Sequence, residues 1–326
     1  MEFHPAVIFV AGLVIIILGA EMILRSAARI AIMLHIKPII IGLTIVSVGT
    51  STPELAVGIT AGFSGEGEMA IGNIIGTNFV NILFILGLSA AIRVLPIQQQ
   101  SLKLDLPMVV FSSVFLLFLS MDGVISRLDG GILFFMAIAY TVVLIRMSRQ
   151  ESVAVQHEFV QEFGAEKTIT TWTATTKTWN LIVLCAGMAL SVLGADLLVD
   201  SAVSIAEHFG VSNAIIGLTI VAIGTSSPEL VTTILSTIKN DRDVAIGNLI
   251  GSSIYNILFI LGVTAFVVPG GINIGSDLLW IDFPLMIAVA LLCIPIFRSR
   301  STVSRKEGAL FVLLYFAYMA LLLSRI

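Results

Sequence analysis

Apolar residues fall into runs of about 18–25 along the chain, which is the length that a helix needs to cross a bilayer. Polar turns separate the runs, and the sequence lacks the short alternating segments typical of a membrane β-barrel. We therefore expect an all-α polytopic membrane protein with ten transmembrane helices. The predicted spans lie near residues 6–24, 38–62, 69–92, 105–121, 129–147, 178–199, 213–238, 244–268, 278–297 and 307–324.

A polar stretch over residues 149–177 separates five predicted spans from five others. Its threonines, charges and short length favour a connecting loop with at most one short helix, and no folded domain of its own. The expected division is a first five-helix repeat over 1–148, a linker over 149–177 and a second five-helix repeat over 178–326. All three parts belong to one integral membrane domain.

Lysine and arginine residues indicate the orientation. If the N-terminus lies outside, 15 of the 17 Lys and Arg residues fall on the cytoplasmic side, and only Arg127 and Arg325 fall outside. Loops rich in Lys and Arg stay in the cytoplasm. We therefore expect an integral protein of the cell (inner) membrane with both termini outside and the 149–177 loop in the cytoplasm. Because each repeat has an odd number of spans, the second repeat would be inverted relative to the first.

Residues 42–88 and 217–263 are two copies of one segment, with 25 of 47 positions identical at a constant offset of 175 residues. The copies begin GLTIVSVGTSTPEL and GLTIVAIGTSSPEL, and each places one glutamate, Glu54 or Glu229, inside an apolar stretch. A carboxylate at membrane depth is costly and therefore indicates function. Paired, interrupted apolar segments are typical of secondary transporters, whose site lies between the repeats.

Each copy should break its helix beside the glutamate. Pro53 has no N–H, so the Gly49 carbonyl loses its helical partner. Thr50 lies four residues before Glu54, on the same face of a helix. Irregular backbone at membrane depth is tolerated where it is buried or lines a wet cavity. The second copy repeats these features with Gly224, Thr225, Ser226, Pro228 and Glu229.

Amide and hydroxyl side chains spaced by four residues line one face of each following span. The two sets are Asn73, Thr77 and Asn81, and Asn248, Ser252 and Asn256. Gly72 and Gly76, like Gly247 and Gly251, form GxxxG pairs that allow helices to approach closely.

All of these candidate ligands are oxygens, which hard cations such as Ca²⁺ and Na⁺ prefer, whereas Zn²⁺ or Cu⁺ would favour His or Cys. The chain is 57% apolar and 12% charged, with a net charge of −4 and a mean hydropathy of +1.06. No basic tract suggests a nucleic-acid partner, so the lipid bilayer is the expected surroundings. Cys185 and Cys293 lie in separate apolar runs and are interpreted as buried apolar residues without a disulfide.

Three acidic residues outside the motifs have structural interpretations. Glu21 lies four residues before Arg25, which predicts a local ion pair. Asp105 and Asp282 precede prolines near predicted helix starts, which favours a capping role.

The paired GTSxPEL and GNxIG[TS]xxxNI segments resemble the two α-repeats of sodium/calcium exchangers, in the calcium/cation antiporter superfamily. The similarity covers nearly the whole chain and is closest to the short prokaryotic type. It implies an antiporter, not an enzyme, that exchanges Na⁺ for Ca²⁺ by alternating access and needs no cofactor. The two glutamates supply two negative charges, matched by one Ca²⁺ or two Na⁺, and the third Na⁺ that the resemblance implies would make exchange electrogenic.

The resemblance also implies roles for individual residues. Glu54 and Glu229 would bind Ca²⁺ together with the carbonyls of Thr50 and Thr225. The flanking Na⁺ sites would involve Ser51, Ser226, Thr77, Ser252 and the carbonyls of Ser47 and Ala222. Asn81 and Asn256 would lie at the central position, and the first and sixth spans would slide across the core.

Other functions stay open at this point. Some family members, notably the potassium-dependent exchangers, carry Asp where this chain has Asn256, which argues against K⁺ coupling. Proton coupling is an alternative because buried glutamates can carry protons, although the GNxxEH-like pattern of proton-coupled exchangers is missing from the sequence. A cation channel is less favoured because channel filters usually come from rings of subunits. For an intramembrane enzyme, no nucleophile or substrate groove is legible.

Overall fold

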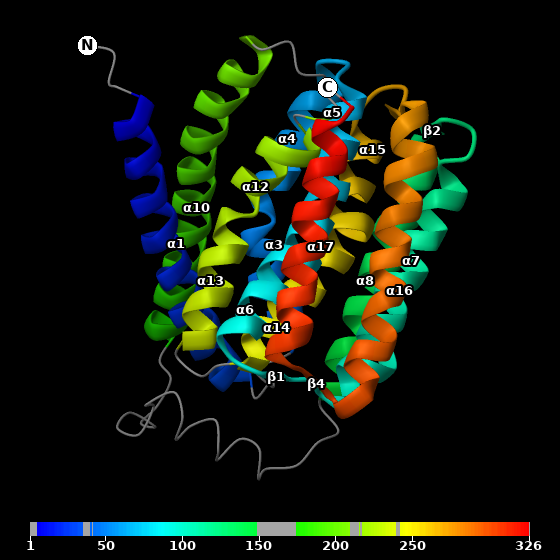
Figure 1. The fold of residues 1–326 in the computed structure, drawn as a ribbon. Helices are drawn as coiled ribbons and strands as arrows, with labels where there is room; N and C mark the ends of the chain where they lie inside the picture. Colours follow the sequence, from blue (N-terminus) through cyan, green and yellow to red (C-terminus); the bar gives the residue numbers. More distant parts are fainter. Residues whose placement is uncertain are drawn as a thin grey trace.

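Long helices run side by side from one end of the molecule to the other, and the start of α1 and the end of α17 lie at the same end (Figure 1). The computed structural model describes residues 5–34, 40, 42–148, 174–208, 215, 217–238 and 242–325.

The first half of the chain alternates long helices with short π-helical turns, labelled η. Its elements are α1 (Pro5–Leu34), η1 (Gly42–Val46), α3 (Ser47–Thr50), α4 (Thr52–Phe63), α5 (Gly67–Phe79), η2 (Val80–Ile85), α6 (Leu86–Ile92), β1 (Leu95–Pro96), η3 (Ser101–Asp105), α7 (Leu106–Leu119), β2 (Val124–Ile125) and α8 (Arg127–Ser148).

The second half has the same succession of elements. They are α10 (Ala174–His208), η4 (Gly217–Val221), α12 (Ala222–Thr225), α13 (Ser227–Ile238), α14 (Arg242–Tyr255), η5 (Asn256–Leu261), α15 (Gly262–Val267), β3 (Ile272–Asn273), η6 (Leu278–Asp282), α16 (Phe283–Arg300), β4 (Thr302–Val303) and α17 (Arg305–Leu323).

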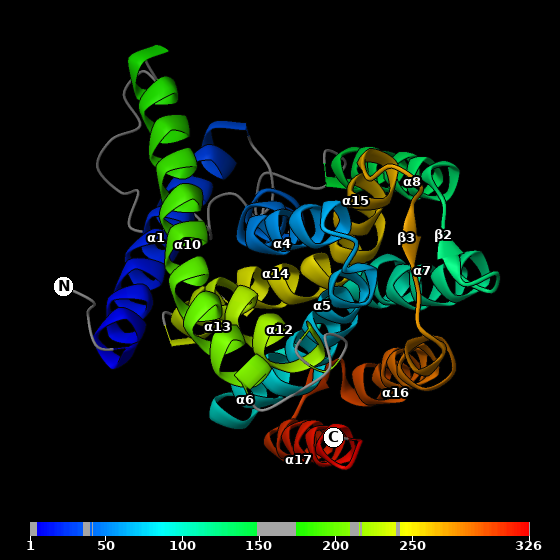
Figure 2. The same cartoon turned by 90° about the horizontal axis from the view of Figure 1, so that it is seen from above.

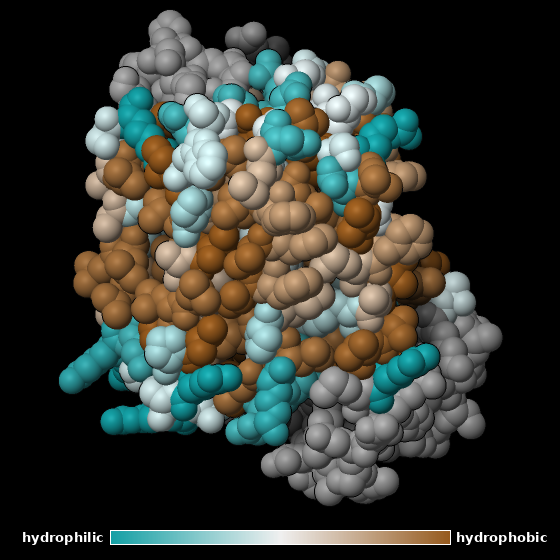
Figure 3. Space-filling view, turned by 90° about the vertical axis from the view of Figure 1, so that its right-hand side faces the viewer, coloured by the Kyte–Doolittle hydropathy of each residue, from teal (hydrophilic) through white to brown (hydrophobic). Residues whose placement is uncertain are grey.

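Within the described ranges, six helical stretches are long and apolar enough to cross a membrane. They are Gly67–Ile92, Ser101–Leu119, Arg127–Arg146, Ala245–Val267, Leu278–Arg300 and Arg305–Leu323. Figure 3 shows the outer face of the bundle as an apolar band between two polar ends. Large apolar side chains such as Phe118, Phe135 and Leu313 are more than 60% exposed, which suits a surface solvated by lipid. The fold is that of an all-α polytopic membrane protein.

Several predicted boundaries differ from the structure. The expected linker was to end at residue 177, but α10 already begins at Ala174 and continues to His208. α1 likewise runs to Leu34, ten residues past the expected end of the first span. Hydropathy reports only the apolar part of a helix, whereas backbone hydrogen bonds continue through polar residues beyond it. The expected loop structure over 149–173 lies outside the described residues, as do the starts of the predicted second and seventh spans.

Short π-helical turns interrupt the helices at matching places in the two halves. η1 and η4 precede the broken helices. η2 begins one residue before Asn81, and η5 begins at Asn256. η3 ends at Asp105, and η6 ends at Asp282. A π turn inserts one extra residue into an α-helix and is often found at functional sites. These turns therefore shift the faces on which the following side chains lie.

Two small antiparallel sheets tie the halves together. β1 pairs with β4, and β2 pairs with β3, so each sheet takes one strand from each half. β1 and β4 lie at the lower end of the bundle in Figure 1, and β2 lies at the upper end. β2 and β3 run side by side in the view from above (Figure 2).

The helices α1 and α10 lie against each other at one side of the bundle (Figures 1 and 2). Glycines let their backbones approach closely: a Cβ on Gly19 would meet the Gly187 carbonyl at 2.7 Å, and one on Gly194 would meet the Gly12 carbonyl at 2.8 Å. The predicted ion pair between Glu21 and Arg25 is confirmed, at 2.7 Å.

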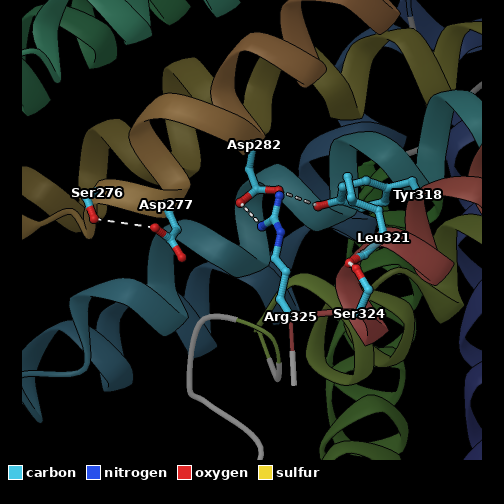
Figure 4. A network of polar contacts seen from close by, with 7 residues as sticks. All are labelled: Ser276, Asp277, Asp282, Tyr318, Leu321, Ser324 and Arg325. Atoms are coloured by element: carbon cyan, nitrogen blue, oxygen red, sulfur yellow. Dashed lines mark hydrogen bonds and ion pairs between the residues drawn. The ribbon is translucent and has the colours of Figure 1, made fainter.

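The capping role expected for Asp105 and Asp282 is wrong. Neither aspartate makes a side-chain hydrogen bond to the start of the following helix. Asp105 accepts the Tyr140 hydroxyl at 2.9 Å, and Asp282 accepts the Tyr318 hydroxyl at 3.2 Å. Asp282 also pairs with Arg325 at 2.9 Å (Figure 4). The π turns place both carboxyls inside the bundle, where tyrosines of other helices reach them.

The two cysteines also differ from the prediction. Both are free, but only Cys293 is buried, whereas Cys185 on α10 is exposed. Since α10 contacts the bundle along one side only, an apolar position on its outer side faces the surroundings (Figure 2).

Candidate ion-binding site

A break in the helix at Ser51 separates α3 from α4, as Pro53 predicts. The Thr52 hydroxyl donates to the Gly49 carbonyl at 2.9 Å and to the Val48 carbonyl at 3.2 Å. The Gly49 carbonyl, which has no helical N–H partner at Pro53, is therefore not left free, because the Thr52 hydroxyl takes the place of that N–H.

The matching break in the second half lies at Ser226, between α12 and α13. There the Ser227 hydroxyl donates to the Ile223 carbonyl at 3.1 Å, in the same relation as Thr52 to Val48. Both breaks thus leave their carboxylates, Glu54 and Glu229, in the first turn of a buried helix.

Glycines bring each broken helix against the other half's asparagine-bearing helix. A Cβ on Gly76 would lie 2.5 Å from the Leu218 carbonyl, and one on Gly251 would lie 2.7 Å from the Leu43 carbonyl and would meet Ser47 Oγ. The close helix approach predicted from the GxxxG pairs is confirmed at these two glycines.

Each broken helix donates a hydroxyl to an asparagine of the other half. Thr50 Oγ1 donates to Asn248 Oδ1 at 3.3 Å, and Thr225 Oγ1 donates to Asn73 Oδ1 at 3.1 Å. All four side chains are buried. The reciprocal contacts bring the two copies of the sequence motif together in one place.

The two carboxyls in this place are fully buried, but their partners differ. Glu229 Oε1 accepts hydroxyls from Ser51 at 2.9 Å and from Ser252 at 3.4 Å. Ser226, the counterpart of Ser51, donates instead to Thr77 Oγ1 at 3.3 Å. Neither oxygen of Glu54, nor Glu229 Oε2, has a hydrogen-bond partner in the part of the chain that the structure describes.

Asn81 and Asn256 are also fully buried, and both amide atoms of each lack a partner among the described residues. An unpaired buried polar group costs about 1–3 kcal/mol, and a charged group costs more. The three unpaired carboxylate oxygens of Glu54 and Glu229 are therefore expensive unless a cation neutralises and coordinates them. Oxygens of this kind suit Na⁺ and Ca²⁺.

The backbone carbonyls expected to help bind Na⁺ are already in use. The Ser47 carbonyl accepts the Ser51 N–H at 3.0 Å, and the Ala222 carbonyl accepts the Ser226 N–H at 3.1 Å. The second lone pair of each oxygen faces a threonine hydroxyl, that of Thr50 at 3.4 Å from the Ser47 carbonyl and that of Thr225 at 3.5 Å from the Ala222 carbonyl. A cation would therefore have to displace these long hydroxyl contacts to reach the carbonyls.

Thr232 and Thr233 were missed by the sequence analysis. Asn248 Nδ2 donates to their hydroxyls at 3.1 and 3.3 Å, and both residues are buried. The available signal was their spacing, three and four residues after Glu229, which places them on the face of the carboxylate. Across the described ranges, no group of three or more His, Cys, Asp and Glu gathers into a transition-metal site.

Comparisons with known proteins show which family the chain is similar to. The family model described as "Sodium/calcium exchanger protein" matches residues 4–146 and 179–324. The chain is 34% identical to the putative antiporter CaxA of Alkalimonas amylolytica, over 98% of this chain and 99% of that protein. It is 29% identical to the sodium/calcium exchanger MaX1 of Methanosarcina acetivorans, over 97% of each. A solved structure of the sodium-calcium exchanger NCX_Mj, soaked with Na⁺ and Ca²⁺, superposes with a TM-score of 0.78 at 26% identity, covering 98% of this chain and 99% of that one.

Proposed function

Because the chain belongs to the sodium/calcium exchanger protein family, we propose that it is a secondary antiporter that exchanges Na⁺ for Ca²⁺ across a membrane. The observation that carries the proposal is the meeting of the two halves at one buried place, where Ser51 of the Glu54 motif donates to Glu229 and both carboxyls keep oxygens without a partner among the described residues. The broken helices that hold them are typical of transporters.

The two carboxylates bind Ca²⁺, assisted by the carbonyls of Thr50 and Thr225. Na⁺ binds beside the carboxylates, through hydroxyl and carbonyl oxygens. These come from Ser51, Ser226, Thr77 and Ser252, and from the carbonyls of Ser47 and Ala222. Asn81 and Asn256 contribute neutral amide oxygens at the centre. Since two negative charges balance one Ca²⁺ or two Na⁺, a third Na⁺ makes exchange electrogenic.

The fold assignment includes ten spans in two inverted five-helix repeats, the first over 1–148 and the second beginning with α10 at Ala174. The matching π turns support this division. So does the exchange of strands: β1 and β4 pair at one end of the bundle and their counterparts β3 and β2 at the other. The charge bias of the loops supports an orientation in a cell (inner) membrane with both termini outside and the loop between the repeats in the cytoplasm.

The test is Ca²⁺ flux in proteoliposomes. Vesicles loaded with Na⁺ and diluted into Na⁺-free buffer should accumulate Ca²⁺, and vesicles without a Na⁺ gradient should not. An inside-positive potential should accelerate this uptake if three Na⁺ leave for each Ca²⁺ that enters. Ca²⁺ uptake driven by a K⁺ or H⁺ gradient in the absence of Na⁺ would show that the coupling ion is K⁺ or H⁺ instead of Na⁺. An ion current at channel-like rates would show that the protein is not an exchanger.

A further inference from the structure

One face of α13 continues the polar character of Glu229 along the helix. Thr232, Thr233, Ser236 and Thr237 follow the glutamate by three, four, seven and eight residues, so all lie on its side of the helix. Each of the four is at most 1% exposed. We call these four residues the hydroxyl face.

The matching face of α4 has no hydroxyl group. The counterparts of the hydroxyl face are Val57, Gly58, Ala61 and Gly62. On this side α4 packs closely against α15, Val268 and β3. A Cβ on Gly58 would lie 2.9 Å from Thr264 Oγ1, and one on Gly62 would lie 2.6 Å from a methyl of Val268.

The residue that matches Thr264 in the other half is Ser89, on α6, which packs against α13. Ser89 is fully buried, and its hydroxyl oxygen is without a hydrogen-bond partner among the described residues. The hydroxyl of Thr237 is likewise buried and unpartnered there. The close glycine contact of α4 is thus replaced on α13 by small side chains with unused polar atoms.

Hydroxyl groups in membrane helices commonly bond back to their own backbone. Thr232 does so, donating to the Pro228 carbonyl at 2.8 Å, and it also accepts from Asn248. Thr237 makes no such bond. A purely structural role for the hydroxyl face therefore leaves the Thr237 and Ser89 oxygens unexplained, each at a desolvation cost of about 1–3 kcal/mol.

We propose that the hydroxyl face, together with Ser89, lines the passage by which cations move between the site at Glu229 and the end of the bundle where α13 ends. Neutral oxygens can replace part of a cation's hydration shell without holding it as a carboxylate would, which conduction requires. The opposite passage cannot follow the matching face of α4. The two access routes therefore differ, although the binding residues are nearly symmetric.

The proposal rests on the proposed antiport for the identity of the cations, Na⁺ and Ca²⁺, and on the proposed orientation for the side. Figure 1 shows α13 running toward the lower end of the bundle and α4 toward the upper end. In the proposed orientation the lower end is cytoplasmic.

Thiol accessibility tests the passage without relying on transport. In a full-length background with Cys185→Ser and Cys293→Ala, Ser236→Cys is compared with Ala61→Cys, its counterpart on α4. A membrane-impermeant cationic thiol reagent, a methanethiosulfonate ammonium, is applied from each side of the vesicle. Ser236→Cys should react from the side where α13 ends, more slowly when Ca²⁺ or Na⁺ is present, and Ala61→Cys should not react from either side.

Equal reactivity of the two cysteines would overturn the passage. Reaction of Ser236→Cys from the other side alone would keep the passage and reverse the orientation. If Ser236→Cys does not fold, Thr233→Cys serves in its place. Because labelling is read directly, a failure of Na⁺-driven uptake leaves this result interpretable.

A second measurement addresses the hydroxyl itself. Thr237→Val keeps the shape of the side chain and removes its oxygen, and Thr264→Val is the matched change beside α4. Loss of one hydroxyl contact should raise the half-saturating Ca²⁺ concentration on the α13 side by about three- to tenfold for Thr237→Val. Thr264→Val should leave this value unchanged, and equal shifts in both variants would contradict the proposal.

Discussion

Ser51 Oγ donates a hydrogen bond of 2.9 Å to Glu229 Oε1, across 178 residues of sequence. The hydroxyl at the helix break of one half therefore serves the carboxyl of the other half. Its counterpart Ser226 donates to Thr77 instead, and Glu54 is left without a partner within the described ranges. Two nearly identical motifs thus build two unequal carboxyl environments.

Neutralising either carboxyl should strongly weaken Ca²⁺ binding and therefore exchange. Glu54→Gln or Glu229→Gln removes one of the two buried negative charges that face the cation, and removing one partner of a buried charge pair costs about 2–5 kcal/mol. Apparent Ca²⁺ affinity in Na⁺-loaded vesicles should fall by roughly 30-fold or more. Glu68→Gln, an exposed glutamate of the same half, is the control. Unchanged uptake in Glu54→Gln would show that the site has been placed wrongly.

The unequal carboxyls predict unequal effects of two matched serine variants. Ser51→Ala removes the shorter of the two bonds to Glu229, whereas Ser226→Ala removes a bond between two neutral hydroxyls. Bonds to charged groups contribute about 1.5–3 kcal/mol and neutral ones about 1 kcal/mol. Titrating Na⁺ and Ca²⁺ in flux assays should therefore show the larger loss of affinity in Ser51→Ala. A larger loss in Ser226→Ala would be inconsistent with this geometry.

Close helix approach at the site predicts that one added methyl group is harmful. Gly76→Ala and Gly251→Ala would press a Cβ against backbone carbonyls, which cannot move aside as a side chain can. Overpacking of this kind costs about 1–3 kcal/mol, more than the helix propensity gained by replacing glycine. Thermal unfolding in detergent should show both variants destabilised.

The matched control for this prediction is Gly131→Ala on α8. Its Cβ would meet Phe266 at 3.7 Å, an ordinary contact. The variant should be as stable as the parent or slightly more stable. If Gly76→Ala unfolds at the same temperature as Gly131→Ala, the close approach does not exist in solution.

The two aspartates held by tyrosines should respond differently to mutation. Arg325→Met leaves the buried Asp282 carboxylate without its cation, and because the guanidinium is partly exposed we expect a loss of about 1–3 kcal/mol. Adding Asp282→Asn to that variant should restore part of the loss, as measured by unfolding in detergent. Asp105→Asn removes no ion pair among the described residues and keeps an acceptor for Tyr140, so its effect should be smaller. If the double variant loses as much stability as Arg325→Met and Asp282→Asn lose together, Arg325 and Asp282 do not stabilise each other.

Sequence patterns predicted much of this molecule because the repeat supplied each inference twice. The two broken helices meet the asparagines Asn248 and Asn73 of the opposite halves, and Ser51 meets Glu229, so the two copies of the motif come together. The π turns were not predicted, because one inserted residue leaves no signature in hydropathy. For that reason Asp105 and Asp282 were assigned to capping, although the turns before them aim both carboxyls inward.

The different hydrogen-bond partners of Glu54 and Glu229 could not be predicted from the sequence either. They depend on rotamers and on distances of a few tenths of an ångström between helices, which motifs that read almost alike cannot reveal. The carbonyl of Gly49 shows the same limit, since the adjacent Thr52 hydroxyl could have faced either way.

Interleaving of the halves has a consequence for biosynthesis. α6 packs against α17, α8 against α15 and α7 against α16, and each terminal sheet takes one strand from each half. While the ribosome is still making the second half, the first half already sits in the bilayer with its glycines and Glu54 facing no partner. Until residues 217–323 have been synthesised, the first half is therefore an incomplete folding intermediate that exposes polar groups to lipid. We expect this intermediate to be the form most susceptible to quality-control proteases.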